Sequence, residues 1–303
     1  MEYPKISIIG AGSVGATTAY SLILRHVATE IFLIDIDQKR CEGEILDLSD
    51  ALSFGRASQI KRGTMDDARK SKITVICAGA RQKPGQKREE LIAINKKIVA
   101  SIIQDLKPID PNAIIIIVTN PMDIITYYAQ KESGLPTGQV FGTGTFLDTQ
   151  RIRRLVSHTL GIADQSVHAY ALGEHGDSQF VAWSSASVAG RPLMDFPQIN
   201  KNMLDQFLKT SINKAYEIIA CKGATFFGIA ACVSAICENI IFDRKYVLPL
   251  STYIKDLNVC LSMPVVLGKH GIERIIDIPL DEDEKTLLKK SGEKLRNIIE
   301  ETQ

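Results

Sequence analysis

Short apolar runs alternate with longer amphipathic runs through the first half of the chain. Four of the apolar runs are ISII at 6–9, IFLI at 31–34, ITVICA at 73–78 and AIIIIV at 113–118. Between the last two, apolar residues recur every three or four positions, at Leu91, Ile94, Ile98, Ile102 and Leu106. This spacing predicts a helix with one apolar stripe. Strands that alternate with helices predict a doubly wound parallel α/β sheet, buried on both faces.

The pattern changes after about Gly142. Two helical stretches come first, then strand-like runs and a last amphipathic helix. The helical stretches cover 148–161 and about 199–242, the strand-like runs 246–254, 259–267 and 272–278, and the last helix 281–301. Gly161 is expected to end the first helix and Gly223 to break the long one. We therefore predict an α/β domain over 1–142 and an α+β domain over 143–303.

Composition and charge exclude several classes of protein. The 303 residues are 45% hydrophobic and 23% charged, and the net charge of +1 gives no long-range field for nucleic acid or an anionic membrane. No apolar run approaches a membrane span, and the start MEYPKISIIG has no leader-like pattern, so we expect a cytoplasmic protein. The six cysteines show no metal-type or paired spacing and are expected to be free thiols.

A glycine motif follows the first apolar run. Gly10, Gly12 and Gly15 form G-x-G-x-x-G between a predicted strand and a predicted helix, which is the Rossmann arrangement for binding a pyrophosphate. Asp35 ends the next strand, twenty positions after Gly15. A carboxylate there favours NAD over NADP, because it accepts hydrogen bonds from ribose and repels a 2′-phosphate. Asp37 competes for this role, and a simple glycine turn is the structural alternative.

One histidine lies where an apolar core cannot explain it. His175 stands in the polar, glycine-flanked segment LGEHGD, and histidine is the natural proton donor for hydride transfer to a ketone. Asp148 and Arg151 are three apart and share a helix face, whereas Arg153 points to another face, which suggests two anion sites. The alternative is a structural histidine, with a capping Asp148 that forms an ion pair on a solvated surface.

A charged loop follows the apolar run at 73–78. Of the ten residues 81–90, six are charged and four of these are cations, with Pro84 and Gly85 between them. An ordinary surface turn is shorter and does not need four cations. The loop is therefore a candidate part of an active site.

Seven motifs together carry a family resemblance. They are GAGSVG, LID, GARQKPGQKR, VTNPMD, GTGTFLDTQRIR, GEHGD and KGAT, and they span essentially the whole chain. In order and spacing they resemble the L-lactate dehydrogenases of the lactate/malate dehydrogenase family, especially the bacterial members. The resemblance implies reversible hydride transfer between NADH and pyruvate.

The resemblance also implies roles for single residues. His175 would protonate the carbonyl oxygen of pyruvate, and Asp148 would pair with His175. Arg151 would clamp the substrate carboxylate in a bidentate fork. Asn120 would hydrogen-bond the substrate oxygen near the nicotinamide ribose, and Val14 would join the glycines in binding the cofactor.

The charged loop matches the mobile active-site loop of the family. Arg88 would close over the substrate and polarise its carbonyl, and Gln82 would sense the substituent on C3. Malate dehydrogenases have arginine at the position of Gln82 and usually glycine at that of Glu174. Thr225 would line the pocket at the methyl end of the substrate. These matches favour pyruvate over oxaloacetate.

Two residues of the loop depart from the family pattern. Gln86 stands where glutamate is common, and Glu89 where leucine is common. The segment GEHGDSQFVAW also resembles the hydroxyisocaproate dehydrogenases, which take bulkier 2-oxo acids. A broader L-2-hydroxyacid dehydrogenase is thus the first alternative, and a malate dehydrogenase the second. A non-enzymatic NAD-binding protein would be expected to lack part of the catalytic set, which is complete here.

A second anion site follows from the same resemblance. Arg153 and His168 match the pair with which allosteric bacterial members bind fructose 1,6-bisphosphate between subunits. Two copies of such donors on a two-fold axis suit one bisphosphate. The alternative is a buried strand histidine and a solvated helix arginine. We expect activation by fructose 1,6-bisphosphate and a homotetramer.

Overall fold

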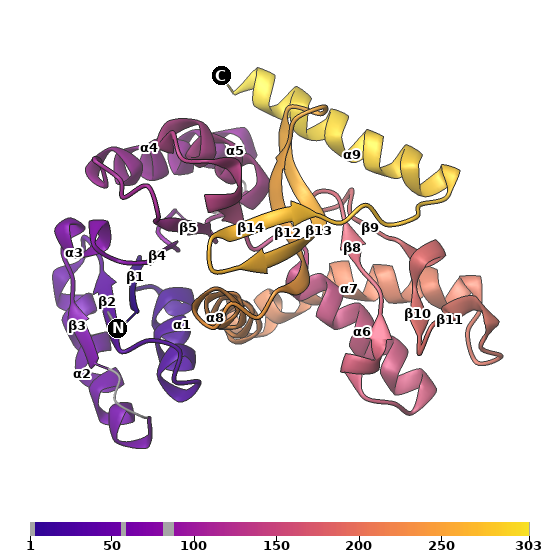
Figure 1. Ribbon diagram of the computed structural model, residues 1–303, viewed down its shortest axis with the longest axis horizontal. Coiled ribbons are helices and arrows are strands. Elements are labelled where there is room, and N and C mark those ends of the chain that lie inside the picture. The colour runs from indigo at the N-terminus through magenta and orange to yellow at the C-terminus, as the bar shows by residue number, and fades with distance from the viewer. Residues whose placement is uncertain (1–3, 56–58, 81–87, 303) are drawn as a thin grey trace.

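The computed structural model describes residues 4–55, 59–80 and 88–302, and these residues form a mixed α/β structure (Figure 1). The helices are α1 (Ser13–Leu24), α2 (Gln38–Ala51), α3 (Met65–Arg69), α4 (Arg88–Asp105), α5 (Met122–Ser133), α6 (Phe146–Leu160), α7 (Lys201–Lys222), α8 (Phe227–Ile241) and α9 (Glu282–Glu301). The strands of the main sheet are β1 (Lys5–Ile9), β2 (Glu30–Ile34), β3 (Gln59–Arg62), β4 (Ile73–Ile76), β5 (Ile114–Ile117), β6 (Val140–Gly142), β12 (Tyr246–Ile254), β13 (Val259–Gly268) and β14 (Gly271–Ile275).

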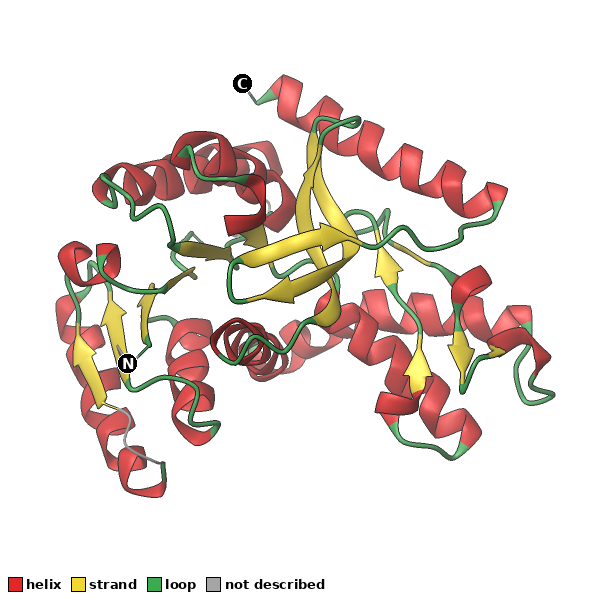
Figure 2. Ribbon diagram, viewed as in Figure 1, coloured by secondary structure: helices red, strands yellow, loops and turns green. Residues whose placement is uncertain are grey.

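Six strands of the first half pair in parallel. Their order is β3-β2-β1-β4-β5-β6, which is the strand order of a dinucleotide-binding doubly wound sheet. Strands β4 and β5 are buried along their whole length, as strands covered on both faces must be. Figure 2 shows helices on both sides of these strands. The α/β class predicted from the apolar runs is confirmed.

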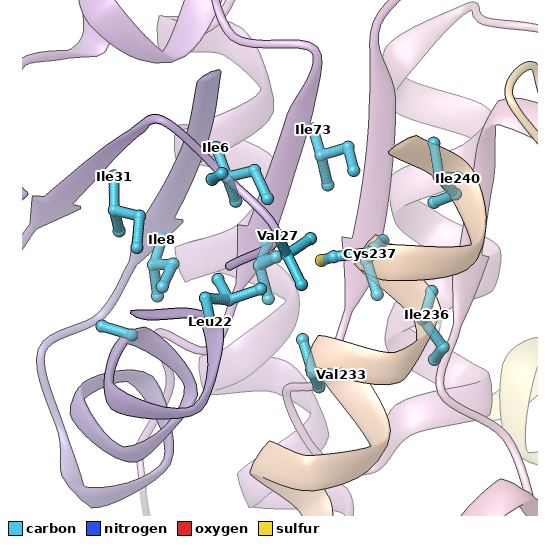
Figure 3. Close-up of a cluster of buried hydrophobic side chains, with 14 of the residues drawn as sticks. Ile6, Ile8, Leu22, Val27, Ile31, Ile73, Val233, Ile236, Cys237 and Ile240 are labelled. Atoms are coloured by element: carbon cyan, nitrogen blue, oxygen red, sulfur yellow. The ribbon is translucent and has the colours of Figure 1, made fainter. Parts of the chain in front are cut away.

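The two faces of the parallel sheet are covered by helices from different parts of the chain. Successive side chains of β5 point to opposite faces of the sheet. Ile115 and Ile117 pack with α4 and α5 on one face. On the other face, Ile114 and Ile116 pack in a cluster that holds residues of α1 and of α8. Figure 3 shows side chains of α8, among them Cys237, beside those of the parallel strands. The second half of the chain therefore completes the core of the first.

The last three strands extend the same sheet. Strands β12, β13 and β14 are antiparallel, and β12 joins β6 through the pair Ser251 and Gly142. The three strand-like runs of the sequence are thus confirmed, although β14 ends at Ile275 rather than at Ile278. Because the sheet is continuous, the boundary expected near 142 falls between bonded strands.

The helices of the second half begin and end close to the expected residues. Helix α6 begins at Phe146, two residues before Asp148, and ends at Leu160, with Gly161 as its C-cap at φ +67°. The long helical stretch is broken at Gly223, where φ is +82°, into α7 and α8. Glycine suits both ends because a side chain would strain a left-handed backbone.

Between α6 and α7 the chain forms strands of two residues each. They are β7 (Val167–His168), β8 (Ala171–Leu172), β9 (Phe180–Val181), β10 (Ser187–Val188) and β11 (Arg191–Pro192). The sequence pattern did not predict them, because two residues are too few to show a period. They gather with α6 and α7 on the side of β12 to β14 away from β1 to β3 (Figure 1).

The structure also bears on the cysteines and on the apolar character of the helices. All six cysteines are free thiols, as expected, and of these only Cys221 is exposed. In the described part of the chain, none of the helices is both long and apolar enough to cross a membrane.

Candidate active site

The candidate site lies at the carboxyl ends of the parallel strands. The glycine motif follows β1, the segment Ala78–Gly79 follows β4, and Asn120 follows β5. The turn after β6 leads directly into α6, which carries Asp148. Ligands of doubly wound sheets bind at this edge, because the loops from neighbouring parallel strands open there.

Each glycine of the motif meets a different physical demand. Gly10 has φ +108°, and a Cβ there would lie 2.6 Å from the backbone nitrogen of Ala78. A Cβ on Gly15 would lie 1.9 Å from the carbonyl oxygen of Gly10, so only glycine lets α1 approach β1 this closely. At Gly12, in contrast, a Cβ would meet no atom within 4 Å. The loop is therefore open at Gly12, where α1 begins.

This open loop fits a pyrophosphate. Gly12 is the N-cap of α1 and provides no capping side chain, and the amino end of a helix attracts anions. Val14, the second residue of α1, is half-buried, and its carbonyl oxygen accepts a 2.8 Å hydrogen bond from the Thr18 hydroxyl.

The structure separates the two candidate ribose acids. Asp35 directly follows β2, and its Oδ2 accepts a 2.6 Å hydrogen bond from the Ala11 amide inside the glycine motif. Asp37 instead caps α2, because its Oδ1 accepts from the amide of Arg40 at 3.0 Å. Asp35 is therefore the carboxylate beside the dinucleotide loop, where it would face a ribose and repel a 2′-phosphate.

His175, Asp148 and Arg151 form one cluster. Asp148 is 2% exposed, and its Oδ2 lies 2.7 Å from Nδ1 of His175. Its Oδ1 accepts a 3.0 Å hydrogen bond from Nη1 of Arg151, which also donates to the carbonyl oxygen of Ser211 at 3.2 Å. Three N–H groups of Arg151, on Nε and Nη2, form no bond with the described residues. Asp148 is thus a buried partner of two cations and not a surface cap.

Hydrogen bonds between distant segments hold this cluster. Thr145, the N-cap of α6, donates its amide to Ser262 of β13 at 3.0 Å and its hydroxyl to the carbonyl oxygen of Ala171. The hydroxyl of Thr149 accepts from the Ala171 amide at 2.9 Å. Helix α6 and the segment that leads to His175 are therefore fixed against one another.

The cluster favours the charged form of the histidine. Burial works against an imidazolium, but the charge and hydrogen bond of Asp148, with Asp123 behind, raise the pKa of His175 to about 9. Burial also works against the Asp148 carboxylate, yet His175 and Arg151 hold the pKa of Asp148 below its usual value. At neutral pH the pair therefore exists as imidazolium and carboxylate.

A second carboxylate, which was not among the predicted site residues, contacts the histidine. Asp123 is 3% exposed, and its Oδ2 accepts a 2.6 Å hydrogen bond from the backbone N–H of His175. Its Oδ1 accepts from the hydroxyl of Ser251, also at 2.6 Å. The only signal in the sequence was the acidic residue that closes the motif VTNPMD.

The other predicted residues are placed in part. Asn120 is exposed at the end of β5, and Thr225 is half-buried between α7 and α8, three residues before Gly228. A Cβ on Gly228, the second residue of α8, would lie 3.0 Å from Leu147, the neighbour of Asp148, so the start of α8 lies beside α6. Gln82 lies outside the described residues. Of Arg88 only the backbone is described, as the first residue of α4.

The predicted anion pair is Arg153 and His168, and the alternative to it was a buried histidine with a solvated arginine. His168 is exposed on β7, whereas Arg153 is half-buried, with its guanidinium 5.0 Å from the centre of the Tyr170 ring. Nε of Arg153 donates to the carbonyl oxygen of Ala169 at 3.1 Å. A buried histidine with a solvated arginine is therefore wrong.

The fold and the cluster together define a class. An open dinucleotide loop beside a paired histidine, aspartate and arginine is the arrangement of an NAD-dependent oxidoreductase of the doubly wound α/β type. Family models agree: residues 4–142 match the NAD-binding domain of lactate/malate dehydrogenases, and residues 145–303 match their α/β C-terminal domain. The chain belongs to the lactate/malate dehydrogenase family, and its cofactor is NAD(H).

Individual relatives cover nearly the full length. L-lactate dehydrogenase A of Rhizopus oryzae is 44% identical over 98% of this chain and 92% of its own length. L-lactate dehydrogenase of Acetivibrio thermocellus is 40% identical over 97% of this chain and 96% of its own. Among solved structures, a lactate dehydrogenase from a Medee basin deep-sea metagenome library superposes with a TM-score of 0.96 at 35% identity, covering 100% of this chain and 99% of that one.

Two glycine variants should separate folding from cofactor binding. Gly15→Ala places a methyl group against a backbone oxygen, and we expect Tm to fall by about 5 °C or more. Gly12→Ala meets no atom, so Tm should stay within about 2 °C of the parent. The Gly12→Ala methyl group would occupy the space for the pyrophosphate, and NADH affinity should fall about tenfold or more. Thermal melts and NADH fluorescence titrations measure both effects, and unchanged NADH affinity in Gly12→Ala would contradict this assignment of the loop.

Proposed function

We propose that the protein is an NAD-dependent L-lactate dehydrogenase, which interconverts pyruvate and L-lactate. The observation that carries the proposal is the buried Asp148 carboxylate, bonded to His175 on one side and to Arg151 on the other. A 2-oxo acid needs a proton donor at its carbonyl and a cation at its carboxylate. His175 and Arg151 offer these two groups at one place. Relatives named L-lactate dehydrogenase support the same reaction.

The residues divide the work as follows. Arg151 binds the substrate carboxylate with the donors that Asp148 leaves unused, and Asn120 bonds the substrate oxygen. His175 donates a proton from Nε2 to the carbonyl oxygen, while Nδ1 stays on Asp148. Bound NADH supplies the hydride that C2 of pyruvate accepts. Asp148 stabilises the imidazolium before transfer and fixes the orientation of the ring.

The remaining roles rest on the sequence alone. Arg88 polarises the carbonyl from the charged loop, Gln82 selects the group on C3, and Thr225 lines the methyl end of the pocket. Residues 1–142 bind the cofactor, and residues 143–303 supply most of the catalytic groups. Location in the cytoplasm agrees with six free thiols and remains a prediction.

A spectrophotometric assay of NADH oxidation tests the reaction. We expect the highest kcat/KM with pyruvate, a lower value with 2-oxoisocaproate and the lowest with oxaloacetate. Higher activity with 2-oxoisocaproate would favour a broader L-2-hydroxyacid dehydrogenase. No turnover with any of the three would overturn the proposal.

The same assay tests the position of Gln82. Gln82→Arg should shift preference toward oxaloacetate by about 100-fold or more, because the new cation pairs with the second carboxylate in a closed pocket. Gln86→Arg is the matched control, since it adds the same charge to the same loop and should leave the preference within about threefold. An equal shift in both variants would show that Gln82 has been misplaced.

The pKa of His175 sets the pH dependence of the reaction. Pyruvate reduction needs the imidazolium, so kcat/KM should be constant near neutral pH and fall as the pH rises through about 9. Lactate oxidation needs the neutral ring and should rise over the same range. Asp148→Asn removes the main anion, so the fall should move to lower pH and kcat/KM at pH 7 should drop about 100-fold. An unshifted profile in Asp148→Asn would contradict the assigned pairing.

We also propose that fructose 1,6-bisphosphate activates a homotetramer through Arg153 and His168. The support is the proximity of the two donors, since Arg153 of α6 bonds the carbonyl of Ala169, and the exposed His168 of β7 is the preceding residue. A guanidinium and an imidazole are both suitable donors for a phosphate, and the His168 side chain is exposed to solvent.

Steady-state kinetics with and without the bisphosphate decide this point. The half-saturation for pyruvate should fall about fivefold or more, and Arg153→Gln should remove that response. Sedimentation in the same buffers should show a shift toward tetramer. Inorganic phosphate at equal ionic strength controls for salt. An unchanged half-saturation from about pH 5.5 to 7.5 would rule the activation out.

A further inference from the structure

Asp123 connects three segments beneath the catalytic histidine. It is the second residue of α5 and is almost fully buried. One carboxylate oxygen accepts from the backbone N–H of His175 and the other from the hydroxyl of Ser251 on β12, each at 2.6 Å. The histidine is therefore held from both ends, by Asp148 at its ring and by Asp123 at its backbone.

We propose that Asp123 is a positioning residue for proton transfer, which fixes the backbone of His175 and adds a second negative charge behind its imidazolium. The inference deepens the proposed function and rests on His175 being the proton donor. Asp123 bonds the histidine only through the backbone, so it acts through His175 and is not itself in contact with the reacting atoms.

The hydrogen bonds suit a carboxylate at this position. Both side-chain oxygens accept, one from an N–H and one from an O–H. An amide of the same shape has one oxygen and one NH₂ group, so one of these two contacts would set donor against donor unless the serine turned its hydroxyl. A buried carboxylate is costly, and here burial raises the pKa of Asp123 to about 6. The buried negative charge of Asp123 is explained by the positive imidazolium of His175, which it stabilises.

Asp148 alone does not balance the two positive charges of the cluster, those of Arg151 and the His175 imidazolium. Asp148 is shared between two cations, and Arg151 disfavours a second positive charge on His175. Asp123 opposes that effect, because its charge favours the imidazolium. The two carboxylates and two cations then balance while the proton is still on His175.

Two other titratable groups lie close to Asp123, and neither can replace it. Glu174, next to His175 in the chain, is buried and bonded to Lys294 of α9 at 2.7 Å. Its charge raises the pKa of Asp123 and so works against the Asp123 carboxylate. Cys260 of β13 is buried, and burial together with Asp123 raises the pKa of its thiol, so it stays neutral.

Asp123→Asn removes the charge and keeps the size of the side chain. In pyruvate reduction, the pH at which kcat/KM falls to half should move down by about one unit, with kcat affected more than KM. NADH affinity, read by fluorescence, should stay within about twofold, because the glycine loop follows β1 and Asp123 is on α5. Ser251→Ala should give a smaller shift in the same direction, and it keeps the proposal testable if Asp123→Asn does not fold.

Ser7→Ala is the matched control. Ser7 is on β1, and its buried hydroxyl forms a 2.7 Å hydrogen bond with that of Ser71, so this variant also removes a buried strand hydroxyl. Its pH profile should coincide with that of the parent. Asp123→Glu restores the charge and should recover part of the shift. If Asp123→Asn and Ser251→Ala both give the parental profile, Asp123 has only a structural role and the proposal is wrong.

A direct titration separates this inference from the proposed reaction. The chain has five histidines, so the ring signal of His175 can be followed by NMR and assigned with His175→Gln. In the protein with no substrate, Asp123→Asn should lower the pKa of that signal by about one unit. Such a shift would support the inference even if no 2-oxo acid were reduced, and its absence would overturn the inference even in an active enzyme.

Discussion

The arrangement of the site depends on one buried carboxylate. Asp148 has lost nearly all contact with water, and an unpaired charge there would cost about 3–5 kcal/mol. It is stable because His175 and Arg151 each bind one of its oxygens. The bonds that Thr145 makes to Ser262 and Ala171 fix the start of α6, and so they keep this pairing in place. The proposed proton donor, His175, and the proposed substrate clamp, Arg151, are thus both positioned by the same anion.

The two halves of the chain share one hydrophobic core. Without α8, the face of the parallel sheet that carries Ile6 and Ile73 would lose the cover of Val233 and Cys237 (Figure 3). The antiparallel strands also continue the sheet beyond β6. Cofactor loop and catalytic cluster are therefore positioned by a single packed unit, which suits hydride transfer, because a small displacement of one reactant relative to the other slows reaction strongly.

Much of this could be predicted from local features. Apolar runs located β1, β2, β4, β5 and β12 to β14, but β3 and β6 were not predicted. Glycines marked the ends of α6 and α7, and motifs pointed to the residues His175, Asp148 and Arg151. Other features depend on contacts between remote segments. The start of α6 is fixed by Thr145 bonded to β13, so it differs from the pattern by two residues. Asp123 was missed because an acid in a motif does not reveal that a serine 128 residues away and a backbone N–H 52 residues away both bind it.

The sequence by itself determined the α/β class, the glycine loop, the acid after β2 and the residues proposed for catalysis, because each of these is carried by a short local pattern or motif. Only the tertiary structure decided that Asp35 and not Asp37 faces the loop, that Asp148 is buried between two cations, and that Arg153 is covered while His168 is exposed. Burial and hydrogen bonding arise between residues far apart in the chain, and these set the charge that each group can keep.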